Sequence, residues 1–61
     1  MENDKDRLLT VEEVLDILRI SRMTLYRIVN SGELKRLKIG SRTFFRRRDV
    51  ERFIESKVVK R

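Results

Sequence analysis

The stretch SRMTLYRIVNSG, residues 21–32, carries the start signal, the apolar stripe and the stop signal of one short helix. Ser21 is a good N-cap, because its hydroxyl can accept a hydrogen bond from a free backbone N–H of the first turn. Gly32 suits the position just past the helix end, where a left-handed backbone costs glycine little. Apolar residues recur at the i, i+3, i+4 spacing of one buried face, at Leu25, Ile28 and Val29.

The opposite side of this predicted helix is polar, basic and aromatic. Its side chains project away from the apolar stripe or lie on the flanks of the stripe: Met23, Arg27, Asn30, Arg22, Thr24 and Tyr26. Such side chains can donate hydrogen bonds, carry positive charge or lay an aromatic edge against a partner. We therefore interpret the segment as a helix that enters the major groove of DNA.

Charge is unevenly distributed along the 61 residues, whose net charge is +6. Residues 1–18 hold six acids and two bases, net −4, whereas residues 19–61 hold fourteen bases and four acids, net +10. Residues 35–48 hold seven bases and no acid. A charge run is usually just a solvated face, but a basic block beside a helix-turn-helix pattern indicates a protein that binds a polyanion.

Composition excludes several kinds of site. A domain of this size buries only ~60% of the surface of its unfolded chain, which leaves no spare core for a deep substrate pocket. The chain has no Cys and no His, which removes thiolate chemistry, the usual zinc ligand sets and the commonest general base. No apolar run approaches the ~20 residues of a membrane span, and no signal-peptide pattern opens the chain. We expect a cytoplasmic protein, associated with the bacterial nucleoid when bound to DNA, with no enzymatic activity, cofactor, metal, membrane or small-molecule substrate.

A first helix is predicted over residues 11–18. Thr10 as N-cap with Glu13 three residues later makes a capping box, and Leu9 with Val14 can form a hydrophobic staple. The apolar residues of this helix follow the same helical spacing, at Val11, Val14, Leu15 and Leu18. The helix dipole favours negative charge near the start of the helix, so the acids there have an ordinary stabilising role, which is more common than a catalytic one.

Only three residues, 19–21, join the two predicted helices, so the helices must pack as a crossed helix-turn-helix. Beyond Gly32 the apolar period changes from 3.6 toward 2, and two extended segments around Gly40 and Ser41 predict a β-hairpin. A two-residue loop would place Phe44 beside Leu37 on the buried face, and a three-residue loop would place Phe45 there. The sequence leaves this register open. We favour Phe45 inside. In either register the hairpin tip and outer face carry Lys38, Ser41 and Arg42.

A last helix is predicted over about residues 48–57, with Val50, Phe53 and Ile54 as its inward stripe. The domain organisation that follows is a disordered N-terminal tail over 1–7, a domain over 8–57 and a C-terminal tail over 58–61. The fold class is mostly α with a small β-hairpin, that is, three helices plus a two-stranded wing.

The stretch Leu8–Ile54 resembles the excisionase-type, MerR-like winged helix-turn-helix family. The shared motifs are a helix start, a recognition helix, a turn into the wing, a wing glycine and a closing helix: Thr10, Glu12 and Glu13; Ser21, Thr24, Leu25, Tyr26 and Arg27; Gly32, Glu33 and Leu34; Gly40; Arg46, Asp49, Val50, Phe53 and Ile54. Two positions depart from the family pattern. Lys35 stands where proline is frequent, and Arg19–Ile20 stand where glycine often precedes valine, which puts the geometry of two turns in doubt.

The resemblance implies how DNA contacts would divide. The second helix would lie in the major groove and the wing along the minor groove or the phosphate backbone. The implied contact residues are Ser21, Arg22, Met23, Thr24, Tyr26, Arg27, Lys38, Ser41, Arg42 and Arg46. Structural roles compete at some of these positions. Tyr26 could be half core, and Thr24 could merely cap the helix. Arg46 and Arg47 could be clamps on the DNA backbone or ion-pair partners of Asp49 and Glu51.

The resemblance also implies a role. We expect a sequence-specific excisionase, also called a recombination directionality factor. Several cooperating copies would bind double-stranded DNA near an attachment site and bend it. They would thereby help a site-specific integrase to excise a phage or mobile element. A small MerR-like transcriptional regulator is the alternative, since both roles need only specific DNA binding. A basic module that binds RNA or protein is a third possibility.

Overall fold

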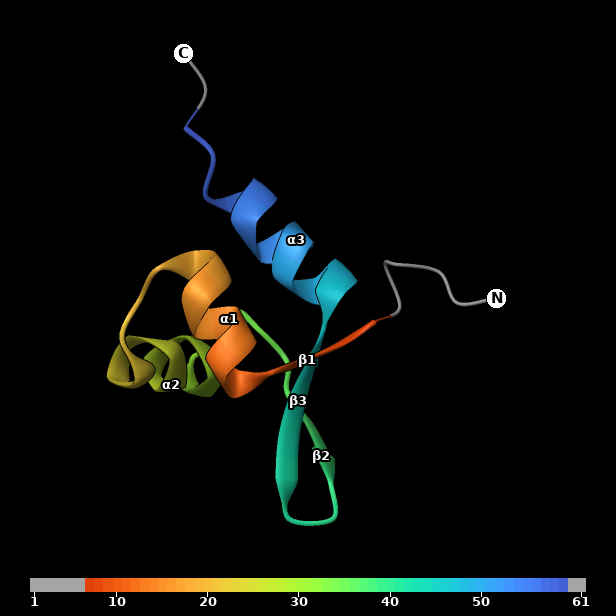
Figure 1. Cartoon of the computed structure of the whole chain (residues 1–61). Helices are drawn as coiled ribbons and strands as arrows, with labels where there is room; N and C mark the ends of the chain where they lie inside the picture. Colours follow the sequence, from red (N-terminus) through yellow and green to blue (C-terminus); the bar gives the residue numbers. More distant parts are fainter. Residues whose placement is uncertain (1–6, 60–61) are drawn as a thin grey trace.

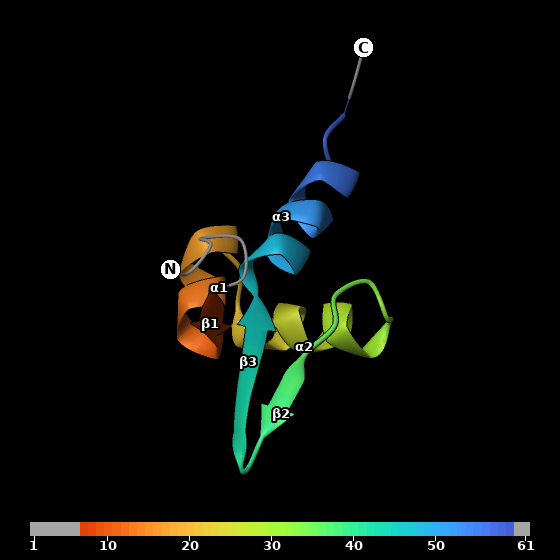
Figure 2. The ribbon, with the colours of Figure 1, turned by 90° about the vertical axis from the view of Figure 1, so that its right-hand side faces the viewer.

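The computed structural model describes residues 7–59, so the tail predicted over residues 1–7 lies, apart from Arg7, outside the described residues. The elements in chain order are β1 (Leu8–Thr10), α1 (Val11–Leu18), α2 (Arg22–Asn30), β2 (Leu37–Ile39), β3 (Arg42–Arg46) and α3 (Arg47–Ser56). Figures 1 and 2 show α1 and α2 on one side of the sheet, with the β2–β3 hairpin and α3 extending in opposite directions. Within the described residues, no helix combines the length and apolar character needed to cross a membrane.

The predicted capping box at the start of α1 is confirmed. The Thr10 N–H donates to Glu13 Oε1 at 2.9 Å, and the Glu13 N–H donates to Thr10 Oγ1 at 3.1 Å. The helix ends at Arg19, whose φ of 59° lies in the left-handed region and whose N–H donates to Leu15 O at 2.8 Å. This is the turn where the sequence departs from the family pattern, and arginine there adopts a conformation that glycine adopts at lower cost.

Both predicted ends of α2 are confirmed. Ser21 Oγ accepts from the Thr24 N–H at 3.2 Å. Past the other end, Gly32 has φ of 86°, and the N–H groups of Gly32 and Glu33 donate to Val29 O at 3.1 Å and Ile28 O at 3.3 Å. This pair of bonds is a Schellman motif, which satisfies carbonyls at the helix end.

The sheet has three antiparallel strands in the order β1-β3-β2, one strand more than the predicted two-stranded wing. β1 is only three residues long, which is too short to show an alternating pattern in the sequence. It pairs Leu9 with Phe45 and thereby ties the hairpin to the start of α1.

The hairpin register combines features of both predicted alternatives. Gly40 and Ser41 form a two-residue turn that sets Leu37 opposite Phe44. Phe45 is nevertheless the buried phenylalanine, as we favoured, and Phe44 is half-buried. The assumption that Leu37 marks the buried face was wrong. The helices cover the face that carries Leu9 and Phe45, so Leu37 and Phe44 lie on the other face of the sheet.

The core draws on almost every element. Its fully buried members are Leu9, Val14, Leu25, Leu34, Phe45 and Val50, and seven partly buried residues pack around them: Val11, Leu15, Leu18, Ile20, Ile28, Val29 and Phe53. The predicted stripes of α1 and α2 are therefore confirmed. The prediction for the last turn of α3 was wrong, because Ile54 is 39% exposed. Ile54 faces Leu18, Ile20 and Ile28 across an apolar hollow beside the end of α3 that Figure 1 shows, so its side chain stays partly open to solvent.

The first described residue is bonded to the fold, whereas the last described residues are exposed. Arg7 is joined to the fold, because its carbonyl accepts from the Arg47 N–H at 3.0 Å and its guanidinium lies 3.8 Å from a Glu13 carboxylate oxygen. Val58 and Val59, at the start of the predicted C-terminal tail, are 49% and 77% exposed.

Candidate nucleic-acid interface

The outward face of α2 is open to solvent. Met23 is 68% exposed and Tyr26 is 46% exposed, and Arg22 and Arg27 are exposed as well. Met23 is therefore not a core residue, and Tyr26 shows about half of its surface. Because the opposite side of α2 is buried at Leu25, this face is fixed in direction and can meet a partner without rearrangement of the helix.

The start of α2 carries two exposed hydroxyl groups. Ser21 Oγ and Thr24 Oγ1 lie 3.0 Å apart and share a hydrogen bond, in addition to the bond from the Thr24 N–H to Ser21 Oγ. Ser21 therefore caps α2 in the free protein, and the Thr24 hydroxyl bonds to the capping hydroxyl rather than to a backbone N–H. Contact of either hydroxyl with a phosphate stays a prediction, which the exposure of both residues allows.

The wing exposes its predicted contact residues, but not all on one face. Lys38, Ser41 and Arg42 are exposed. Lys38 pairs with Thr43 and Ile39 pairs with Arg42, so Lys38 and Arg42 leave the hairpin from opposite faces. The expectation of one outer face for both cations was therefore wrong. The guanidinium carbon of Arg42 lies 5.8 Å from the centre of the Phe44 ring, a cation–π arrangement that steadies the side chain.

The start of α2 and the wing meet at a shallow hollow of about 230 Å³. Arg22 lines it from the helix and Arg42 lines it from β3, and the remaining walls come from the start of α1 and from β3: Thr10, Val11, Glu12, Thr43 and Phe44. The fold thus brings together two predicted contact residues that are twenty positions apart. A helix and a wing that present cations to one concavity are suited to a strand of phosphates that passes between them.

Glu12 also lines this hollow and is a candidate functional residue that the sequence did not indicate. Its Oε2 accepts a hydrogen bond from Arg22 Nη2 at 3.0 Å. The Arg22 guanidinium, and to a smaller degree Arg42, holds the pKa of Glu12 below its usual value. Glu12 in turn raises the pKa of Arg22. From the sequence, Glu12 is expected only to interact with the dipole of the first helix. Its contact with Arg22 depends on the crossing angle of the two helices, which the spacing of residues in the sequence does not show.

Arg46 lies apart from the other predicted contact residues. It is half-buried at the far end of β3 and lines a different hollow, beside Arg48 and Arg52 of α3. Of the two roles proposed for Arg47, the ion pair is present, since its Nε lies 3.2 Å from Glu51 Oε2. Arg48 and Arg52 are not among the predicted contact residues, although their i, i+4 spacing on a predicted helix places both side chains on one face.

Comparison with known proteins agrees with this geometry. A family model described as "Helix-turn-helix domain" matches residues 8–58. Two proteins of Mycobacterium tuberculosis, "Putative DNA-binding protein MT0521" of strain CDC 1551 and "Putative DNA-binding protein Rv0500A" of strain H37Rv, are each 50% identical over 36 residues, or 59% of this chain. The matched part spans 46% of each relative, that is, about half its length. No solved structure matches the chain.

Proposed function

Because this chain belongs to the helix-turn-helix domain family, we propose that α2 reads base pairs in the major groove while the wing holds the adjacent phosphate backbone. One observation carries this proposal: Arg22 of α2 and Arg42 of the wing line the same hollow. Bases and the phosphates next to them would be contacted by Arg22, Met23, Tyr26 and Arg27, and an arginine paired bidentately with guanine gives roughly 1–3 kcal/mol of discrimination. Ser21, Thr24, Lys38, Ser41, Arg42 and Arg46 would contact phosphates.

The proposed biological role is that of an excisionase. Several copies would bind adjacent sites near an attachment site, bend the DNA and assist a site-specific integrase. Support comes from the resemblance of residues 8–54 to that family and from the basic surface of α2 and the wing. Bending a short site costs on the order of 1–6 kcal/mol, which several cooperating copies could offset together. One recognition helix reads few base pairs, so cooperative binding would also supply specificity.

Footprinting on the DNA that flanks the gene of this protein tests the proposal, since it reports the site, its spacing and the number of copies together. We expect protection of several adjacent sites. Protection of one site that overlaps a promoter, with normal excision when the gene is deleted, would favour the regulator. An electrophoretic shift series over increasing salt should favour duplex DNA over RNA, and equal affinity for RNA would contradict the DNA proposal.

A further inference from the structure

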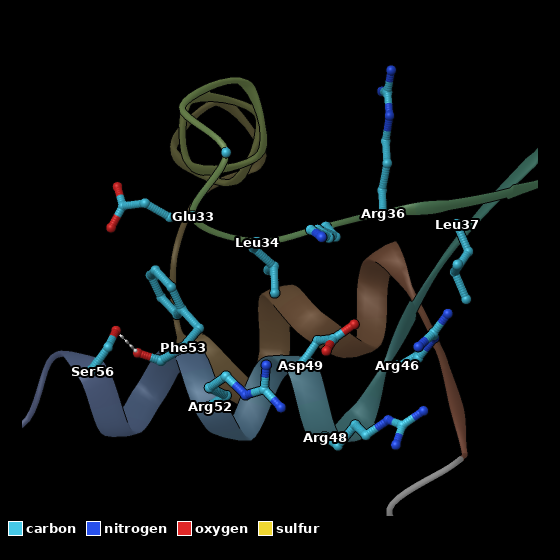
Figure 3. Close-up of a pocket in the computed structure, with 12 residues that line it drawn as sticks. Glu33, Leu34, Arg36, Leu37, Arg46, Arg48, Asp49, Arg52, Phe53 and Ser56 are labelled. Atoms are coloured by element: carbon cyan, nitrogen blue, oxygen red, sulfur yellow. Dashed lines mark hydrogen bonds between the residues drawn. The ribbon is translucent and has the colours of Figure 1, made fainter.

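A second basic hollow lies between the segment that follows α2 and one side of α3, and Figure 3 shows the residues that line it. Its volume is about 500 Å³, within the range of ligand sites in proteins. Five cations line it: Lys35, Arg36, Arg46, Arg48 and Arg52. Of the acids that the structure describes, Glu33 and Asp49 line it as well. The hollow is therefore strongly cationic.

The ion pairs of the described residues leave three arginines of this cluster unneutralised. Glu33 pairs with Lys57, which is outside the hollow, at 2.5 Å. Among the ion pairs between residues that the structure describes, none includes Arg36, Arg46 or Arg52. Like charges that gather without carboxylate partners, as Arg36, Arg46 and Arg52 do within the described residues, destabilise the folded state through mutual repulsion. An anionic ligand would relieve this repulsion, which is the signature of a binding surface rather than of an internal salt-bridge network.

The arginines of α3 and β3 are arranged to share one ligand. Arg48 and Arg52 are four residues apart on α3, so their side chains lie on one face of the helix. In Figure 3 the Arg46 and Arg48 side chains lie close together at the junction of β3 and α3, whereas Arg36 points away. The first turn of α3 also lines the hollow and has no side-chain cap, so its positive helix end adds to the field of the arginines.

This hollow is separate from the hollow between α2 and the wing. Arg42 opens β3 and lines the first hollow, and Arg46 closes β3 and lines the second. Four residues of extended strand separate them by about 13 Å. Arg22 likewise begins α2 beside the first hollow, while Gly32 follows the end of α2 beside the second. A phosphate in the second hollow therefore belongs to DNA outside the segment that α2 reads.

We propose that the hollow lined by Arg46, Arg48 and Arg52 binds the phosphodiester backbone of DNA, and so gives the domain a second DNA contact on the side of α3. This inference rests on the proposed DNA-binding function and extends it. The phosphates come either from flanking DNA that bends toward α3 or from a second duplex. In the first case the hollow stabilises the bend, and in the second case it joins two DNA segments.

The test compares the wild type with the variant Arg48→Ala/Arg52→Ala on two DNAs. One is a short duplex limited to the footprint of α2 and the wing, and the other adds about two helical turns on each side. If flanking DNA enters the hollow, the variant loses about tenfold in affinity for the long duplex, and its slope of log K against log salt becomes shallower by about 1–2. Its affinity for the short duplex stays unchanged.

A second arm measures bridging, as capture of a labelled duplex by protein bound to an immobilised duplex. If a second duplex enters the hollow, the variant loses bridging and keeps both affinities. Arg7→Ala/Arg19→Ala removes two cations outside both hollows and should match the wild type in every assay. Arg48→Lys/Arg52→Lys keeps the charge and should restore most of the lost binding.

Three results would overturn the inference. Unchanged long-duplex binding together with unchanged bridging would show that no phosphate enters the hollow. An equal loss on the short duplex would place the hollow within the surface that α2 and the wing already form. Competition by polyglutamate that equals competition by DNA, and that is lost in the alanine variant, would assign the hollow to an acidic protein partner. A wild type that fails to bind the short duplex would instead overturn the proposed function.

Discussion

Glu12 places a carboxylate where bound DNA would place a phosphate. Its side chain holds Arg22 at 3.0 Å in the free protein, and both residues line the hollow between α2 and the wing. A phosphate that enters this hollow must compete with Glu12 for Arg22. The ion pair therefore orients Arg22 before binding and also weakens binding, because DNA must displace or repel a negative charge.

Removing this carboxylate tests the competition. We expect Glu12→Gln to raise affinity for duplex DNA by about two- to fivefold, in line with the small effects of single exposed ion pairs. The gain should shrink at high salt, because exposed charges are then screened. Glu55→Gln removes an equal charge from the exposed end of α3 and serves as the control in the same titrations. An equal gain in both variants would trace the effect to net charge alone.

Substitutions of Arg27 and Arg42 should separate the recognition of bases from the contact with phosphates. Arg27→Ala should weaken specific binding more than non-specific binding, because it removes a contact with base edges. Arg42→Ala should weaken both and make the salt slope shallower by about 0.9 for each lost phosphate contact. Salt titrations of each variant on a specific and a scrambled duplex give both quantities. The reverse pattern would show that the two roles are exchanged.

Two turns contain a residue in the left-handed backbone region, and the type of that residue differs between them. Arg19 ends α1 with φ of 59°, and Gly40 opens the hairpin turn with φ of 62°. Glycine adopts this region freely, whereas a residue with a Cβ pays roughly 1–2 kcal/mol. The turn between α1 and α2 thus stores strain that the hairpin turn avoids.

Exchanging these residue types should shift stability in opposite directions. Arg19→Gly should stabilise the fold by about 1 kcal/mol, and Gly40→Ala should destabilise it by about 1 kcal/mol. An added Cβ at Gly40 meets nothing within 4 Å, so the second effect reports backbone strain alone. Denaturant unfolding of both variants measures the two values. A destabilised Arg19→Gly protein would mean that the Arg19 side chain contributes more than its backbone costs.

The ion pair between Glu33 and Lys57 joins the segment after α2 to the end of α3. Lys57, followed by Ser31, lowers the pKa of Glu33 from its usual 4.5. A lowered pKa adds stability that is present above pH 4.5 and is lost as Glu33 takes up a proton at lower pH. We therefore expect the melting temperature to fall below about pH 4.5, and to fall less in Glu33→Gln. Thermal melts over a pH series compare the two, and parallel curves would contradict the linkage.

At the scale of the whole molecule, stability depends on a very small core. Six buried residues from β1, α1, α2, β3, α3 and the 32–37 segment meet there, so each element depends on contacts made by the others. Domains of this length typically have roughly 3–9 kcal/mol of stability. One core residue is therefore a large fraction of the total.

Leu25→Ala tests that dependence, because Leu25 is fully buried and lies beneath the outward face of α2. A buried leucine truncated to alanine costs ~2–5 kcal/mol, which is enough to unfold much of the population at 37 °C. DNA binding should fall with it, although the variant changes no contact residue. Circular dichroism melts measure the loss. A cooperative melt close to that of the wild type would contradict the core assignment.

The sequence by itself determined the helices of the helix-turn-helix, their caps, the hairpin turn and the exposed basic face of α2. These features depend on contacts between residues a few positions apart, such as the capping box of Thr10 and Glu13 or the glycine just past α2. Such contacts can be predicted directly from neighbouring residues in the sequence. The burial of Leu25 followed from the same periodicity.

Only the tertiary structure decided what depends on the meeting of distant segments. The strand β1 has no pattern of its own, and its pairing with β3 selects the face that carries Phe45. The crossing of α1 and α2 sets Glu12 against Arg22. The path of the chain after α2 brings its cations to α3 and separates Arg46 from Arg42. Side chains that are far apart in sequence interact only once packing has fixed the angles between their elements, and residue spacing does not encode those angles.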